Sequence, residues 1–181
     1  GPTIVEHADY VMFTGSTATG RVIGSLAGQN LVGCTLELGG KNPLIVLDDA
    51  DLDEVIPGAI MATFLNAGQA CMHIERIYVP ESRRAEFTRR FVQAAQDIEL
   101  GATYDFSPMM GSLVSVAQKD RVESHVDDAV AKGATVLTGG KARPDLGPAV
   151  FDPTAPVCRL IAQISPAGMA PLPAFSLRTG R

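Results

Sequence analysis

The alternation of apolar and polar positions along the chain predicts short strands that alternate with amphipathic helices. Short apolar runs rich in β-branched or aromatic residues are expected as strands, and runs with apolar residues at helical spacing are expected as helices. The expected strands are residues 10–14, 35–38, 43–46, 74–79 and 135–137, and the expected helices are residues 21–27, 52–66, 81–98 and 117–132. This order of elements predicts an α/β fold with mostly parallel strand pairing.

Two of the expected helices carry apolar faces that predict where the core lies. Helix 81–98 has arginines on the side opposite its apolar residues, and helix 117–132 is expected to end before Gly133. Helix 52–66 is expected to be capped by Asp51, with Pro57 kinking it or moving its start downstream. The residues that define the first two faces are Phe87, Phe91, Ala94 and Ala95 in one helix and Val122, Val126, Ala129 and Val130 in the other.

Glycine and proline positions suggest how the chain is divided. Gly39 and Gly40 separate two expected strands and permit a turn or a crossing between domains. Residues 1–39 and residues 40–154 are therefore expected to belong to different domains. Residues 155–181 contain several prolines, no acidic residue and no sustained period, so they are predicted to form an irregular tail.

Composition and charge narrow the classes of partner. The chain has 181 residues, a formal net charge of -5 and no basic run, which argues against a nucleic-acid partner. No apolar run approaches the roughly 18 residues of a membrane span. The three cysteines, Cys34, Cys71 and Cys158, show neither a C-x-x-C pair nor zinc-ligand spacing. Free thiols, a cytoplasmic location and no metal site are expected.

Cys71 is the cysteine whose surroundings suggest chemistry. It lies between an expected helix end and an expected strand, the kind of loop in which a scaffold holds reactive groups. Without its context, a lone cysteine is more often a small buried apolar residue than a nucleophile. His73 follows two positions later, but side chains at this spacing on an extended segment seldom meet, so His73 is predicted to be a bystander and not the partner in a Cys-His dyad.

Two motifs give that cysteine a family context. Gly68-Gln-x-Cys71, followed by Glu75-Arg-x-Tyr-Val79, resembles the active-site segment of the aldehyde dehydrogenase superfamily. The segment Leu36-Glu37-Leu-Gly-Gly-Lys-Asn-Pro43 resembles the glutamate motif of the same family. Glu37 and Cys71 lie 34 positions apart, as in the family. Two motifs in this order at this separation are far more specific than either alone.

A third segment resembles the part of the family that contacts the dinucleotide. Phe13-Thr-Gly15-Ser16-Thr17-Ala-Thr-Gly20 is similar to its strand, loop and helix beside the nicotinamide and pyrophosphate. A phosphate-binding P-loop is the competing interpretation, but Arg21 and Val22 stand where that loop needs Lys and Ser or Thr. The resemblance implies NAD or NADP as cofactor, with Gly15, Ser16, Thr17, Gly20 and Leu38 as cofactor-binding residues.

The resemblance covers about residues 1–154, and within the family the sequence is most similar to the succinate-semialdehyde dehydrogenases. It implies the aldehyde dehydrogenase fold, with residues 1–39 from the NAD(P)-binding domain and residues 40–154 from a partial catalytic domain with a parallel sheet. It also implies oxidation of a small-molecule aldehyde to an acid: Cys71 forms a thiohemiacetal and then a thioester, and Glu37 is the general base for the thiol or the hydrolytic water. Metal ligands are not implied.

Family members extend beyond this chain at both ends, which leaves two alternatives open. The chain is either part of a working dehydrogenase, as a homo-oligomer or with a complementing chain, or a catalytically inactive remnant that serves at most as an interaction module. Incomplete strand pairing and an incomplete cofactor pocket favour little activity of the isolated chain.

Overall fold

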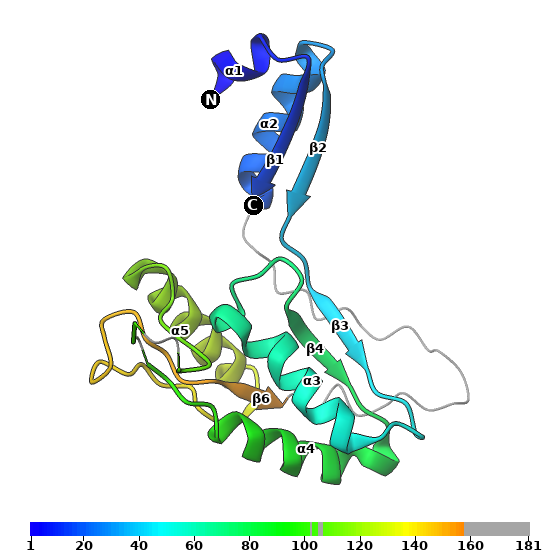
Figure 1. Ribbon diagram of the computed structural model, residues 1–181, viewed down its shortest axis with the longest axis vertical. Helices are drawn as coiled ribbons and strands as arrows, with labels where there is room; N and C mark the ends of the chain where they lie inside the picture. Colours follow the sequence, from blue (N-terminus) through cyan, green and yellow to red (C-terminus); the bar gives the residue numbers. More distant parts are fainter. Residues whose placement is uncertain (102, 105–106, 158–181) are drawn as a thin grey trace.

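The structure, a computed structural model, describes residues 1–101, 103–104 and 107–157 of the chain. Its elements fall into two groups that are joined by a short link (Figure 1). The first group consists of α1 (Pro2–Glu6), β1 (Tyr10–Gly15), α2 (Thr17–Gln29) and β2 (Gly33–Leu38). The second consists of β3 (Asn42–Ile45), α3 (Leu52–Phe64), η1 (Leu65–Gly68), β4 (Ile74–Tyr78), α4 (Glu81–Gln96), α5 (Val116–Ala131), β5 (Thr135–Thr138) and β6 (Ala155–Val157).

The first group is a parallel β-α-β unit. β1 and β2 pair in parallel from Tyr10↔Gly33 to Gly15↔Leu38, with α2 as the crossover between them. Both strands point toward the second group (Figure 1). α2 begins earlier than its predicted start at residue 21, because the Ser16 side chain accepts a hydrogen bond from the Thr19 N–H at 3.1 Å and caps the helix. α1, which starts at a proline, was not predicted.

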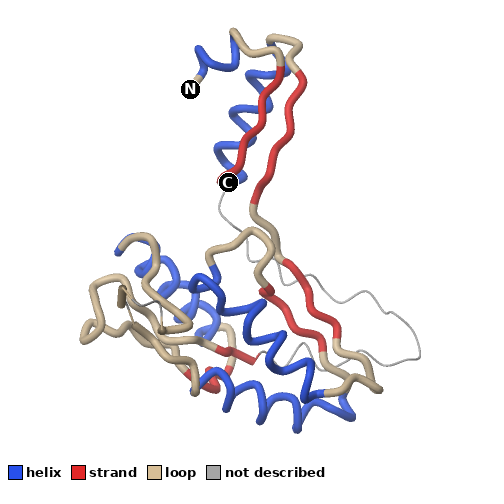
Figure 2. Tube along the Cα trace, viewed as in Figure 1, coloured by secondary structure: helices blue, strands red, loops and turns tan. Residues whose placement is uncertain are grey.

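A second parallel pair continues the chain beyond the link. β3 pairs with β4 from Asn42↔Ile74 to Ile45↔Tyr78, and the crossover runs through α3. The two strand pairs follow one another along the molecule (Figure 2). Gly39, Gly40 and Lys41 lie between β2 and β3, so the chain passes from one pair to the other where the sequence places the domain boundary. The boundary itself stays a prediction.

α3 and α4 enclose the main core together with β3 and β4. Phe87, Phe91 and Ala95 of α4 are buried, and Ala94 packs against the same cluster, which confirms the predicted apolar face. The rings of Phe87 and Phe91 are stacked, with centroids 5.7 Å apart. The buried cluster comprises Val46, Leu52, Ile56, Ala59, Ile60, Phe64, Phe87, Phe91, Ala95, Ile98 and Met110. Burial of each large side chain contributes on the order of 2 kcal/mol.

α3 starts where Asp51 predicts it and ends early. The Asp51 carboxylate accepts the Asp53 N–H at 2.9 Å, and Pro57 lies inside the helix without moving its start. The helix ends at Phe64, two residues before the predicted end, because the chain turns into left-handed conformations just beyond it.

α5 differs from the prediction in its packing. It forms at the expected place, and Ser115 caps its first turn, but none of its residues is buried in the described part of the chain. Val130, predicted to lie on its apolar face, is 49% exposed. The periodicity therefore locates the helix without showing that its apolar stripe is covered.

The predicted irregular tail begins too early. Ala155–Val157 forms β6, which pairs with β5 in antiparallel fashion. The correction has a physical reason, since a three-residue strand that contains Pro156 is too short to show a period of two. This pair is antiparallel, whereas the β1–β2 and β3–β4 pairs have the parallel arrangement expected for most of the fold. Residues 158–181, the rest of the predicted tail, lie outside the described residues.

Gly139 allows the β5 end to approach the segment before β6. Its φ is +71°, and a Cβ at this position would lie 2.2 Å from the Pro153 carbonyl oxygen. The neighbouring Gly140 N–H donates to the Thr154 hydroxyl at 2.8 Å, which fastens the same two segments. A side chain at Gly139 would therefore clash with the Pro153 backbone, which can move only at a large cost in free energy.

We expect Gly139→Ala to lower the free energy of unfolding by roughly 3 kcal/mol or more, because left-handed strain adds to a backbone clash. Gly133→Ala is the matched control: φ there is +90°, yet nothing lies within 4 Å of the added Cβ. The control should lose only about 1 kcal/mol. Urea unfolding of both variants measures the difference, and equal losses would contradict the close approach.

Candidate active site

Cys71 lies in the loop between η1 and β4, with its side chain exposed. Cys34, the other cysteine in the described part of the chain, is partly buried on β2. The backbone before Cys71 is unusual, because Asn66, Ala67 and Gly68 all have positive φ, at 54°, 55° and 71°. Such conformations cost about 1–2 kcal/mol for each residue other than glycine, and strain of this kind concentrates at functional sites.

The carboxamide of Asn42 holds the Cys71 loop. Its Nδ2 donates to the carbonyl oxygens of Cys71, at 2.8 Å, and of His73, at 3.0 Å. Asn42 also pairs with Ile74 at the start of the β3–β4 ladder. The segment that begins with Glu37 thus bonds directly to the backbone of the cysteine segment.

Gln69 fastens the loop on another side. Its Nε2 donates to the Asn66 carbonyl at 3.0 Å and, more weakly, to the Ser112 carbonyl at 3.4 Å. Its Oε1 accepts the Val114 N–H at 2.8 Å. Asn42 and Gln69 belong to the two sequence motifs, but neither of them was predicted to have a role. The available signal was a carboxamide close in sequence to a candidate catalytic residue: Gln69 is two residues before Cys71, and Asn42 is five residues after Glu37.

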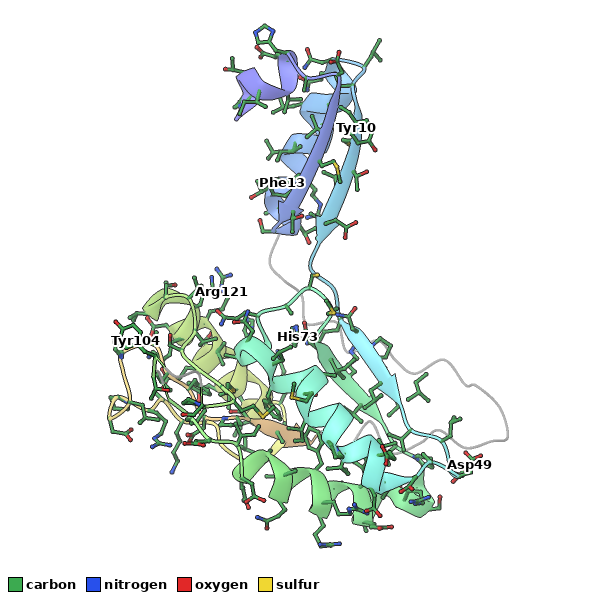
Figure 3. The ribbon with its side chains drawn as sticks, viewed as in Figure 1. Tyr10, Phe13, Asp49, His73, Tyr104 and Arg121 are labelled. Atoms are coloured by element: carbon green, nitrogen blue, oxygen red, sulfur yellow. The ribbon has the colours of Figure 1, made fainter. Side chains whose placement is uncertain are left out.

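Charged groups lie beside the same loop. Lys41 forms an ion pair with Glu75, and His73 Nε2 lies 3.5 Å from Glu75 Oε1. His73 Nδ1 lies 2.7 Å from the Ala70 carbonyl oxygen. His73 sits close to where the link meets the second group (Figure 3). Among the described residues, no three His, Cys, Asp or Glu side chains are grouped so as to hold a metal ion.

Glu37 lies at the opposite end of the link. It is exposed on β2 and pairs with Thr14, while Leu38 pairs with Gly15. Because β1 and β2 are parallel, Glu37 and Gly15 share the carboxyl edge of the pair. From Leu38 to Asn42 the chain can span at most about 14 Å. Since Asn42 bonds Cys71, the fold brings the Glu37 edge and the cysteine loop to the same region.

The predicted cofactor residues gather at that edge. Ser16 and Thr17 form the start of α2, whose first turn contains no acidic residue. Gly20 is buried against Leu38, because a Cβ on Gly20 would lie 2.6 Å from Leu38 Cδ2. The Leu38 side chain and Gly20 therefore set the distance between α2 and β2, while Gly15, Ser16 and Thr17 remain exposed.

No helix in the described part of the chain is both long and apolar enough to cross a membrane. This finding concerns the same residues that form the two groups of elements.

Comparison with known proteins gives one family. The sequence profile of the aldehyde dehydrogenase family matches residues 1–157. Over 154 residues the chain is 54% identical to the Mycobacterium tuberculosis (strain H37Rv) protein named "Putative succinate-semialdehyde dehydrogenase [NADP(+)] 2", covering 85% of this chain and 30% of that protein. It is 42% identical over 142 residues to the betaine aldehyde dehydrogenase of Brucella ovis, covering 77% of this chain and 29% of that protein.

Solved structures agree. The succinate-semialdehyde dehydrogenase of Burkholderia pseudomallei superposes with a TM-score of 0.81 at 38% identity, covering 86% of this chain and 32% of that one. The betaine aldehyde dehydrogenase of Staphylococcus aureus in complex with NAD+ also gives 0.81, at 36% identity and with the same coverage. The chain thus spans about a third of the length of these relatives. It belongs to the aldehyde dehydrogenase family, a family of enzymes that oxidise aldehydes.

Proposed function

We propose that this chain supplies the nucleophile and the general base of an NAD(P)-dependent aldehyde dehydrogenase that converts an aldehyde to a carboxylic acid. One observation carries the proposal: Asn42, five residues after Glu37, bonds the carbonyl of Cys71 at 2.8 Å. This contact supports a shared site, because it joins the segment that follows Glu37 to the loop that carries Cys71, and both the thiol and the carboxylate are exposed.

The chemistry assigned to Cys71 begins with its thiolate. Sγ attacks the carbonyl carbon of the aldehyde, the C–S bond forms, and the carbonyl π electrons move to oxygen to give a thiohemiacetal. Loss of hydride from that carbon gives a thioester on Cys71. Bound NAD(P)+ supplies the acceptor for that hydride.

Glu37 is proposed to handle the protons. As a carboxylate it removes a proton from the thiol before attack, or from the water that attacks the thioester carbon. The C–S bond then breaks, the acid leaves, and the thiol is regenerated. The backbone N–H of Cys71 is proposed to donate to the tetrahedral oxyanion in both additions.

The described residues fit a dinucleotide at the carboxyl edge of β1 and β2. A helix start carries free N–H groups and positive dipole, and α2 has no acidic side chain there to neutralise it. Gly15, Ser16 and Thr17 would hold the phosphates, with Gly20 and Leu38 positioning the helix. The Mycobacterium tuberculosis relative is named for NADP(+), and the Staphylococcus aureus structure is a complex with NAD+, so the proposal includes both cofactors. Residues 1–39 are proposed to belong to the cofactor domain and the following residues to the catalytic domain.

We do not propose the inactive alternative, because Cys71, Glu37 and the Asn42 contact between their segments are all present. The substrate class is proposed from a relative's name: the Mycobacterium tuberculosis protein with 54% identity is named for succinate semialdehyde. A small aldehyde that carries a carboxylate is therefore the first substrate to test.

A chimera tests the proposal. The aligned 154-residue segment of the Mycobacterium tuberculosis relative is replaced by that of this chain, and aldehyde-dependent NAD(P)H absorbance is measured beside the parent. We expect kcat within about tenfold of the parent value, since the segment carries its own nucleophile and base. A folded chimera that binds NAD(P)+ but does not oxidise succinate semialdehyde or betaine aldehyde would refute the proposal.

A further inference from the structure

His73 makes its shortest side-chain contact with backbone and not with Cys71. Its Nδ1 lies 2.7 Å from the Ala70 carbonyl oxygen. Because a carbonyl oxygen can only accept, Nδ1 must carry a proton. The His73 N–H also donates to this oxygen, at 3.2 Å. Two donors from one residue thus fix the orientation of a single carbonyl.

That carbonyl shares a peptide unit with the amide of Cys71. A trans peptide is planar, so the C=O of Ala70 and the N–H of Cys71 point in opposite directions within one rigid plane. The structure contains no cis peptide bond among the described residues. Fixing the Ala70 oxygen therefore fixes the direction of the Cys71 N–H, the group proposed above to donate to the oxyanion.

The imidazole itself is held in place. Its Cδ2 lies 3.5 Å from the position of a Cβ built on Gly68, so the ring packs over a residue that has no side chain. On its other side, Nε2 faces Glu75 Oε1 at 3.5 Å, and Glu75 is also paired with Lys41. The side chain of His73 is 24% exposed. The ring cannot easily rotate away from Ala70.

We propose that His73 is a positioning residue that orients the Cys71 N–H toward the oxyanion by holding the Ala70 carbonyl. The inference rests on the proposed function of Cys71 and revises the prediction that His73 is a bystander. The Cys-His dyad remains unnecessary, because His73 acts through the peptide bond and not on the thiol. Figure 3 shows His73 near the link between the two groups of elements.

The test compares two reactions of Cys71 in the 181-residue chain. Acylation by p-nitrophenyl acetate passes through a tetrahedral oxyanion, whereas alkylation by iodoacetamide does not. Both are followed at Cys71 by peptide mass spectrometry. A change in thiol exposure or ionisation alters both rates, so the ratio of acylation to alkylation reports on oxyanion stabilisation alone.

Two substitutions distinguish the roles of the two nitrogens of the His73 ring. In His73→Asn the amide Nδ2 occupies the place of Nδ1, and in His73→Gln the amide lies near the place of Nε2. We expect His73→Asn to keep the ratio within about threefold of wild type, and His73→Gln and His73→Leu to lower it by about tenfold or more. Unchanged alkylation of Cys34 serves as the control for folding.

Several outcomes overturn the proposal. One is an equal loss in His73→Asn and His73→Gln, and another is an unchanged ratio in all three variants. Nitrogen-15 NMR of the wild-type ring gives a third, because a neutral imidazole protonated at Nε2 alone cannot donate to Ala70. Failure of the proposed function is distinguishable because it is measured in the chimera, either as a folded chimera that binds NAD(P)+ without oxidising aldehyde or as an active Cys71→Ser chimera, whatever the ratio at Cys71 shows.

Discussion

Cys71→Ser is expected to lower the kcat of the chimera by at least about 10⁴-fold, the largest effect of any substitution proposed for this chain. A serine hydroxyl is scarcely ionised near neutral pH, whereas a thiol is partly thiolate and more nucleophilic in either form. The change removes one sulfur from an exposed loop position, so the fold should be unaffected. Steady-state NAD(P)H formation with saturating aldehyde measures the loss.

Cys34→Ser is the matched control, because Cys34 is a partly buried residue of β2 and has no role in the proposed chemistry. It should retain nearly the full kcat. Binding of NAD(P)+ by the Cys71→Ser variant should also persist, since the proposed cofactor residues lie at the start of α2. If Cys71→Ser kept substantial activity while Cys34→Ser lost it, the wrong thiol would have been assigned.

The sequence predicted the parts of this site that depend on local pattern. The strands that carry Glu37 and follow Cys71 show β-branched and apolar runs, and the helices between them carry caps or apolar faces. These signals arise within about ten neighbouring residues, so periodicity and capping rules detect them. The motif spacing then related Glu37 to Cys71 before any geometry was known.

The features of the site that the sequence did not predict depend on contacts between segments distant in sequence. Asn42 reaches Cys71 across 29 positions, and Gln69 reaches Val114 across 45. Ala67 in a left-handed conformation contradicts its own local preference, so no propensity rule predicts the turn that ends α3. His73 was judged by its distance to a thiol, while its actual partner is a backbone carbonyl that sequence patterns do not display.

Glu37→Gln is expected to lower the kcat of the chimera by about 100- to 10,000-fold, the range over which a positioned general base accelerates proton transfer. The substitution preserves the shape of the side chain on the exposed end of β2 and removes only the basic oxygen.

The same Glu37→Gln substitution also separates the two roles left open for Glu37. If the carboxylate activates the hydrolytic water, a rapid burst of NAD(P)H should precede slow turnover, and the thioester should accumulate on Cys71 in mass spectra. If it activates the thiol, the first turnover itself slows and no thioester accumulates. Glu99→Gln, at another exposed glutamate, should leave both phases unchanged. Wild-type turnover in Glu37→Gln would exclude this carboxylate from both proton transfers.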